Sequence, residues 1–159
     1  MIKVTLIALG KLKEAYLRDA VSEYTKRLSR YCDFDVIELE PVKLPDAPSR
    51  TQIDAALEKE AEMIIKKIPK NCDVYPLCVE GKQFTSEEFA EKIDDLSGQG
   101  RGVTFVIGSS YGLSEQVKVM AKTRLSLSKM TFPHQLFRVM LLEQIYRAFK
   151  INEGSTYHK

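Results

Sequence analysis

The sequence has few of the residues that build disulfide frameworks and metal centres. Its three cysteines, Cys32, Cys72 and Cys78, form no CxxC pair and cannot all be bridged internally. Only two histidines accompany them in 159 residues, which argues against a structural zinc site. Thiols stay unpaired where the surroundings are reducing. We therefore expect free cysteines, no metal and a cytoplasmic location.

Long apolar runs are missing as well. None approaches the ~20 residues that a membrane-spanning helix needs, so no membrane association is expected. The apolar segment at residues 2–10 runs directly into Lys11 and Lys13 without a small-residue cleavage site, which indicates a strand and not a signal peptide. Hydrophobic residues make up 44% of the chain and charged residues 29%, values that exclude general disorder. The length favours one domain over residues 1–159.

Phosphate-binding signatures are also lacking. There is no Walker A motif, and the run GQGRG at residues 98–102 precedes a predicted strand, whereas a dinucleotide fingerprint lies between a strand and a helix. The glycine-containing segment 107–114 is different, because it follows a predicted strand and opens a helix. Ligands of open α/β sheets gather at such strand ends. Gly108 therefore belongs either to a ligand-binding loop or to a plain tight turn.

Strand and helix patterns alternate along the chain. Capping boxes at Ser49/Gln52 and Thr85/Glu88 mark two helix starts. Alternation of this kind predicts an α/β fold with a mostly parallel sheet flanked by helices. The predicted strands are 2–9, 34–39, 73–79, 103–107 and 124–128, and the predicted helices are about 13–31, 50–68, 86–96, 115–121 and 133–151.

The net charge of +2 conceals a basic C-terminal quarter. Residues 118–159 carry eight basic side chains against two acidic ones, a net charge of +6. The rest of the chain then has a net charge of −4. Such an asymmetry fits either binding to a polyanion or a solvated, lysine-rich surface, and charge alone does not separate the two.

The last predicted helix has an apolar arc of about 200°, more than one sheet face can cover. A second copy of the chain is the economical cover, which predicts a homodimer through this helix. Arg138 falls near the centre of the arc. Because an unpaired buried charge is costly, Arg138 should either snorkel to solvent or meet an anion such as a carboxylate or a phosphate.

The segment 125–134 joins a predicted strand to the last helix through several hydroxyls, Lys129, a proline and His134. Exposed main-chain groups in such a segment could bind a polar heterocycle. His134 itself is either a surface residue of the first helical turn or a catalytic group.

Several segments, taken together, carry a resemblance. They are IALGKLK at 7–13, EYTKRL at 23–28, LCVEGK at 77–82, FVIG at 105–108, residues 125–134, EQIYRA at 143–148 and the terminal YHK at 157–159. The set is colinear over essentially the whole chain. It resembles the ribosomal RNA large subunit methyltransferase H family of the SPOUT superfamily.

The resemblance implies a SPOUT-type deep trefoil knot at the C-terminal end of the sheet, an obligate homodimer and S-adenosylmethionine bound in a bent conformation in the knot. It implies methylation at N3 of the pseudouridine at position 1915 of 23S rRNA, in helix 69 of the assembled 70S ribosome. The implied cofactor contacts are Leu77, Gly108, Leu127, Ser128, Lys129, Met130, Thr131 and Phe132.

Transfer to N3 of a uracil-type base requires loss of a proton, so a positioned base should help. Tyr157 and His158 on the tail are the candidates, acting across the dimer interface, with Arg138 or Arg147 holding a phosphate or the carbonyls of the base. A disordered tail without function is the alternative.

The sequence departs from the family pattern at two positions. Ser109 stands where the family usually has a second glycine, which narrows the allowed backbone angles. Thr156 stands where a proline often precedes the terminal Tyr-His, which affects the preorganisation of the tail. A non-enzymatic ribosome-associated RNA-binding module that retains the knot is the competing function, and a nucleotide-dependent small-molecule enzyme is a third.

Overall fold

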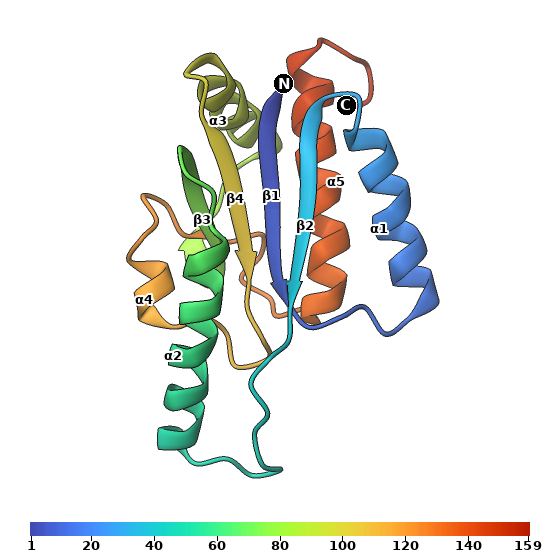
Figure 1. Ribbon diagram of the computed structural model, residues 1–159. Helices are drawn as coiled ribbons and strands as arrows, with labels where there is room; N and C mark the ends of the chain where they lie inside the picture. Colours follow the sequence, from blue (N-terminus) through green and yellow to red (C-terminus); the bar gives the residue numbers. More distant parts are fainter.

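Four parallel strands form the centre of the structure, a computed structural model that describes residues 1–159 (Figure 1). Their order across the sheet is β2-β1-β4-β3. All three pairings between neighbours are parallel, which confirms the predicted α/β class. The strands are β1 (Ile2–Leu9), β2 (Cys32–Leu39), β3 (Cys72–Lys82) and β4 (Gly102–Ile107).

Helices cover both faces of this sheet. The alternation of β1 explains why: Val4, Leu6 and Ala8 belong to one buried cluster, while Ile7 and Leu9 belong to the other. The first cluster packs against α1 (Ala15–Leu28), α3 (Ser86–Gly98) and α5 (His134–Asn152), and the second against α2 (Arg50–Lys67) and α4 (Glu115–Lys118). None of these helices has the length and apolar content needed to cross a membrane.

Local signals set the starts of three helices. The predicted capping boxes are present at both α2 and α3, where Ser49 and Thr85 accept hydrogen bonds from the main chain of Gln52 and Glu88. Ser114 caps α4 by accepting from the Gln116 amide. The sequence reading of these helix starts is therefore confirmed.

The predicted fifth strand at residues 124–128 is wrong. Only Leu125 pairs with the sheet, through isolated bridges to Leu77 in the middle of β3 and to Lys82 at its end. The hydroxyls that follow redirect the chain, because Ser126 donates to the Ser128 carbonyl and Ser128 accepts from the Met130 amide. Local hydrogen bonds of this kind compete with a ladder, and here they prevail.

Arg138 lies in the second turn of α5 with 2% of its surface exposed. Its guanidinium donates to the Glu38 carboxylate at 2.5 Å and to the Gly10 carbonyl. The sequence left open whether Arg138 snorkels to solvent or meets an anion. In the structure it meets an anion, the Glu38 carboxylate. The pair joins α5 to the ends of β1 and β2.

The wide apolar arc of α5 is covered in large part by its own chain. Leu141, Leu142, Ile145 and Ala148 are buried, and α1 and α3 flank the helix on either side. The sheet, α1 and α3 together cover the apolar arc. The sequence analysis considered only the sheet and a second copy of the chain. The homodimer stays a prediction.

Replacing Glu38 by alanine should lower the free energy of unfolding by about 3 kcal/mol, because it leaves the Arg138 charge buried without a carboxylate. Urea denaturation at fixed protein concentration measures this. The control is Glu40→Ala, an exposed glutamate without an ion pair, which should change stability by less than about 0.5 kcal/mol. Equal losses in the two variants would contradict the role given to the Arg138–Glu38 pair.

Candidate active site

Two cavities adjoin each other at the edge of the sheet where the strands end, which is where ligands of parallel sheets bind. The first, the β3–β4 cavity, has a volume of about 460 Å³ and lies between the ends of these strands and the chain before α5. The second, the β1–β2 cavity, has a volume of about 640 Å³ and extends to α2. Ser109, Ser110 and His134 line both, so the cavities share a wall.

Most of the predicted cofactor residues lie at the β3–β4 cavity. Those in its lining are Leu77, Gly108, Leu127, Ser128, Thr131 and Phe132. Lys129 and Met130 are not in the lining, and Met130 is 73% exposed. Cys78 also lines the cavity, and burial raises the pKa of its thiol to about 11, so the thiol is protonated at neutral pH.

The loop after β4 can only be built with glycine at position 108. A Cβ on Gly108 would lie 2.3 Å from the Gly112 carbonyl oxygen, far inside contact distance. Gly112 completes the turn with a φ of +87°. Ser109 does not have a positive φ, so the serine in place of a second glycine adopts ordinary backbone angles.

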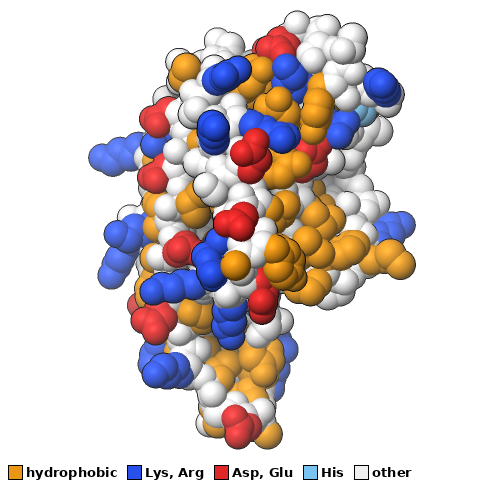
Figure 2. Space-filling view, turned by 90° about the vertical axis from the view of Figure 1, so that its right-hand side faces the viewer, with side chains coloured by type: hydrophobic (Ala, Val, Ile, Leu, Met, Phe, Trp, Pro, Cys, Tyr) orange, Lys and Arg blue, Asp and Glu red, His pale blue; other side chains and the backbone are white.

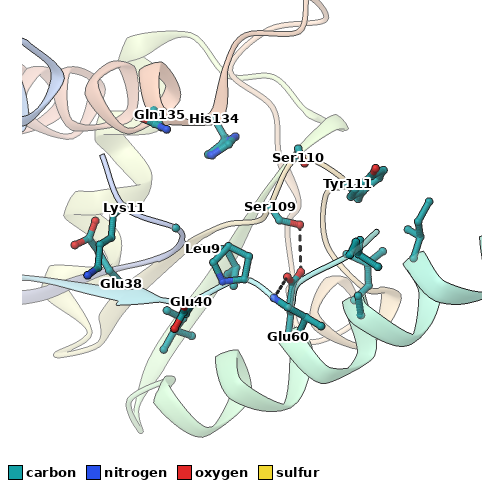
Figure 3. Close-up of a pocket in the computed structure, with 18 of the residues that line it drawn as sticks. Leu9, Lys11, Glu38, Glu40, Glu60, Ser109, Ser110, Tyr111, His134 and Gln135 are labelled. Atoms are coloured by element: carbon teal, nitrogen blue, oxygen red, sulfur yellow. Dashed lines mark hydrogen bonds between the residues drawn. The ribbon is translucent and has the colours of Figure 1, made fainter. Parts of the chain in front are cut away.

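Glu60 is the main residue of this region that the sequence analysis missed. It is 4% exposed and lies at the β1–β2 cavity, where it accepts hydrogen bonds from the Val42 amide at 3.0 Å and from the Ser109 hydroxyl at 3.2 Å (Figure 3). A usable signal exists in the sequence. Glu60 follows Ala56 and precedes Ile64 by four residues each, so all three occupy the buried face of α2.

His134, the first residue of α5, lies between the two cavities. Burial, and then the nearby charges of Arg138 and Lys13, lower the pKa of its imidazole below the ordinary value of 6.5. His134 is therefore neutral at physiological pH and can donate or accept a hydrogen bond without adding a charge.

The predicted catalytic residues of the tail gather around Glu143. The Tyr157 hydroxyl donates to this carboxylate at 2.9 Å, and Arg147 forms an ion pair with it at 2.7 Å. His158 lies 3.2 Å from Arg147 and 2.7 Å from Glu87 through its two ring nitrogens. Partial burial and the Glu143 contact raise the pKa of Tyr157. These contacts hold the tail against α5 and α3.

The cavities lie at the first turn of α5, whereas the tail cluster lies along its middle and second half. Arg147 follows His134 by thirteen residues, which is about 20 Å along a helix. Figure 1 shows the same separation, since the C-terminus lies beside the N-terminus, away from the strand ends. Arg138 is near the cavities, but its guanidinium is engaged by Glu38 and Gly10. Within one chain, Tyr157 and His158 line neither cavity, although Glu143, which Tyr157 contacts, shares a smaller cavity with Leu127.

Comparisons with known proteins match nearly the whole chain. A family model described as predicted SPOUT methyltransferase matches residues 2–158. The chain is 53% identical over 157 residues to the ribosomal RNA large subunit methyltransferase H of Clostridium acetobutylicum, covering 98% of this chain and 99% of that protein. It is 48% identical over 158 residues to the protein of the same name from Streptococcus uberis, with 99% of each covered.

The lowered pKa of His134 predicts a pH dependence of stability. The unfolded chain binds a proton near pH 6.5 that the native state resists, so the free energy of unfolding should fall as the pH drops through 6.5 and be fully retained above it. Denaturation of the wild type and of His134→Gln at several pH values across this range measures how much His134 contributes to the pH dependence of the free energy of unfolding. NMR of the two histidines, assigned with the same variant, should give His134 a midpoint below 6.5. A midpoint above that value would contradict the prediction.

Proposed function

The chain belongs to the SPOUT methyltransferase family, and we propose that it transfers a methyl group from S-adenosylmethionine to N3 of the pseudouridine at position 1915 of 23S rRNA. The proposed substrate is helix 69 in the assembled 70S ribosome, and the proposed location is the cytoplasm. The observation that carries the proposal is the β3–β4 cavity, with a chemistry that suits this cofactor.

The cavity fits the cofactor in size and in charge. Its volume of about 460 Å³ is within the range of small-ligand sites, and its walls are mostly apolar with a few serine hydroxyls. No Asp, Glu, Lys or Arg lines it, and His134 is neutral. S-adenosylmethionine supplies a methyl group on a positively charged sulfonium, and this lining does not repel a cation. Gly108 lets the main chain of the loop approach a ligand closely.

We further propose that residues 124–133 close the deep trefoil knot of the family around this cavity. Two contacts support it. Leu125 bridges Leu77 and Lys82, and a Cβ on Gly81 would lie only 2.7 Å from the Arg124 carbonyl oxygen. The segment therefore packs directly against the end of β3, at the rim of the β3–β4 cavity.

The proton that leaves N3 needs an acceptor, and no ionised side chain lines the β3–β4 cavity. We assign this role to His158, with Arg147 holding a phosphate or a carbonyl of the base. Tyr157 keeps its proton because its pKa is raised, and the Arg138 guanidinium is buried against Glu38 and Gly10. No tail residue lines the β3–β4 cavity of its own chain, so we propose that the tail comes from a second copy. A homodimer with antiparallel α5 helices would bring the tail of one chain to the cavity of the other.

The surface formed by α1 and α5 supports such a dimer. Hydrophobic side chains gather across the middle of this face, with charged side chains around them (Figure 2). Tyr16 of α1 is 69% exposed and Leu136 of α5 is 36% exposed, although both are large apolar residues. A second copy packed here would cover them.

The function is tested by two measurements on the wild-type protein. Calorimetric titration should show binding of S-adenosylmethionine, and mass mapping of 23S rRNA from cells with and without the protein should show one methyl group that depends on it, at pseudouridine 1915. Ribosome binding without cofactor binding and without methylation would identify a non-enzymatic module instead. Methylation at another nucleotide would overturn the proposed target.

The composite site is tested by mixed dimers. His158→Ala should lower the methylation rate by 10²- to 10⁴-fold, roughly the contribution of a positioned base. Thr131→Trp, at an exposed position of the β3–β4 cavity, should block the cofactor. Co-expression of the two variants should restore activity that neither has alone, because one site of each mixed dimer is intact. Full activity of His158→Ala at every pH would reject its role, and failure to complement would reject the composite site.

A further inference from the structure

The β1–β2 cavity has no role in the function proposed above, although it adjoins the site of methyl transfer. It is the larger of the two cavities, at about 640 Å³, and it shares Ser109, Ser110 and His134 with the β3–β4 cavity. A group seated in it therefore lies directly across a common wall from the proposed cofactor. Because the acceptor of a methyl group has to touch the methyl of the cofactor, a base that enters from this cavity would reach it past Ser109, Ser110 and His134.

Glu60 is the polar centre of this cavity. Its carboxylate is buried, and it makes no ion pair. A carboxylate offers about four acceptor positions, of which the Val42 amide and the Ser109 hydroxyl use two. Since burial of a charge is costly unless hydrogen bonds compensate it, the remaining positions favour a ligand that donates N–H or O–H.

The orientation of this carboxylate is fixed before any ligand arrives. Val42 holds one oxygen from the loop after β2, and Ser109 holds the other from the loop after β4 (Figure 3). Ser109 is thus a link between the two cavities, because it lines both and fixes Glu60 in one of them. A preorganised acceptor of this kind is typical of recognition sites.

The rest of the cavity suits a nucleotide. Leu39, Ile53 and Leu57 provide apolar wall, and the Tyr111 ring, 48% exposed, is available for stacking. Lys11 and Lys13 line it and can meet a phosphate, while Glu38 and Glu40 add negative charge to the same lining.

Pseudouridine and uridine differ in the group that would reach Glu60. Pseudouridine is attached to its sugar through carbon, so its ring keeps an N–H at N1 as well as at N3. In uridine N1 carries the sugar and has no hydrogen. N1 and N3 lie on different edges of the ring, so a base with N3 directed to one cavity presents N1 elsewhere.

We infer that the β1–β2 cavity receives the acceptor base and that Glu60 selects pseudouridine over uridine by accepting a hydrogen bond from N1–H. The inference rests on the proposed function, since it assumes that pseudouridine is the substrate. Glu60 is a specificity-determining residue in this scheme, and Ser109 positions it.

The decisive experiment compares two ribosome preparations, one with pseudouridine at the target and one with uridine because the responsible synthase is absent. A site built to bond an N–H rejects an analogue without it by about 10⁴-fold. Glu60→Gln places an amide at this position, with one acceptor oxygen and an NH₂ that repels N1–H. We expect this variant to bind S-adenosylmethionine like the wild type and to lose at least tenfold of the preference for pseudouridine.

Glu62→Gln is the matched control, because Glu62 lies exposed on the same helix and should leave the preference unchanged. The inference is overturned if Glu60→Gln keeps the wild-type ratio of the methylation rates with pseudouridine and with uridine, or if both variants lose this preference equally. It is also overturned if the wild type methylates the two preparations equally well. Failure of the wild type to methylate either preparation would instead overturn the proposed function.

A second pair of variants tests the cavity without touching Glu60. Leu44 lines the cavity from the loop after β2, and Leu44→Trp should fill part of it. The neighbouring Lys43 is exposed and outside the lining, so Lys43→Trp adds the same ring to the same loop harmlessly. Leu44→Trp should raise the KM for ribosomes or abolish methylation while S-adenosylmethionine binding persists, and Lys43→Trp should not. Normal methylation by a folded Leu44→Trp protein would overturn the inference.

Discussion

The buried charge of Arg138 constrains the whole arrangement. Its guanidinium has one carboxylate partner, Glu38, and one main-chain partner, Gly10, at the ends of two adjacent strands. Helix α5 therefore cannot slide or rotate on the sheet without leaving a charge buried and unpaired. Because His134 lies one turn earlier on the same helix, this pair also fixes the imidazole at the wall between the two cavities.

The same helix separates the parts of the proposed site. Its first turn meets the cavities, while Glu143, in its middle, accepts hydrogen bonds from the Tyr24 hydroxyl, the Tyr157 hydroxyl and the Arg147 guanidinium. One carboxylate with three donors holds the tail in a defined place. A rigid helix thus keeps the tail away from the cavity of its own chain, and the proposed dimer turns this separation into a composite site.

Local patterns predicted the parts of the fold that depend on local interactions. The helix caps at Ser49 and Thr85 and the parallel sheet follow from nearby residues and from hydrophobic periodicity. The prediction of a strand at 124–128 was wrong because the hydroxyls of Ser126 and Ser128 form local hydrogen bonds. The alternation of Leu125 and Leu127 in the sequence does not reveal these bonds.

Contacts between distant residues were less accessible from the sequence. Arg138 is separated from Glu38 by 100 residues, so its need for an anion was predictable but its partner was not. Glu60 was missed because a glutamate in a helix is ordinarily solvated. The pocket residues Leu77, Gly108 and Leu127 came from family resemblance, whereas strand-end position alone left Gly108 undecided between a ligand loop and a turn.

The charge of the two cavities differs in a way that suits the proposed reaction. Methyl transfer removes the positive charge from sulfur, so a carboxylate in the β3–β4 cavity would stabilise the reactants more than the transition state and slow the step. Its lining has no such group. The β1–β2 cavity, by contrast, is lined by charges of both signs, Lys11 and Lys13 as well as Glu38, Glu40 and Glu60. A base that loses its N3 proton gains negative charge, which lysines stabilise and carboxylates oppose. Differential binding therefore favours the neutral lining around the sulfonium, and next to the base it favours the lysines.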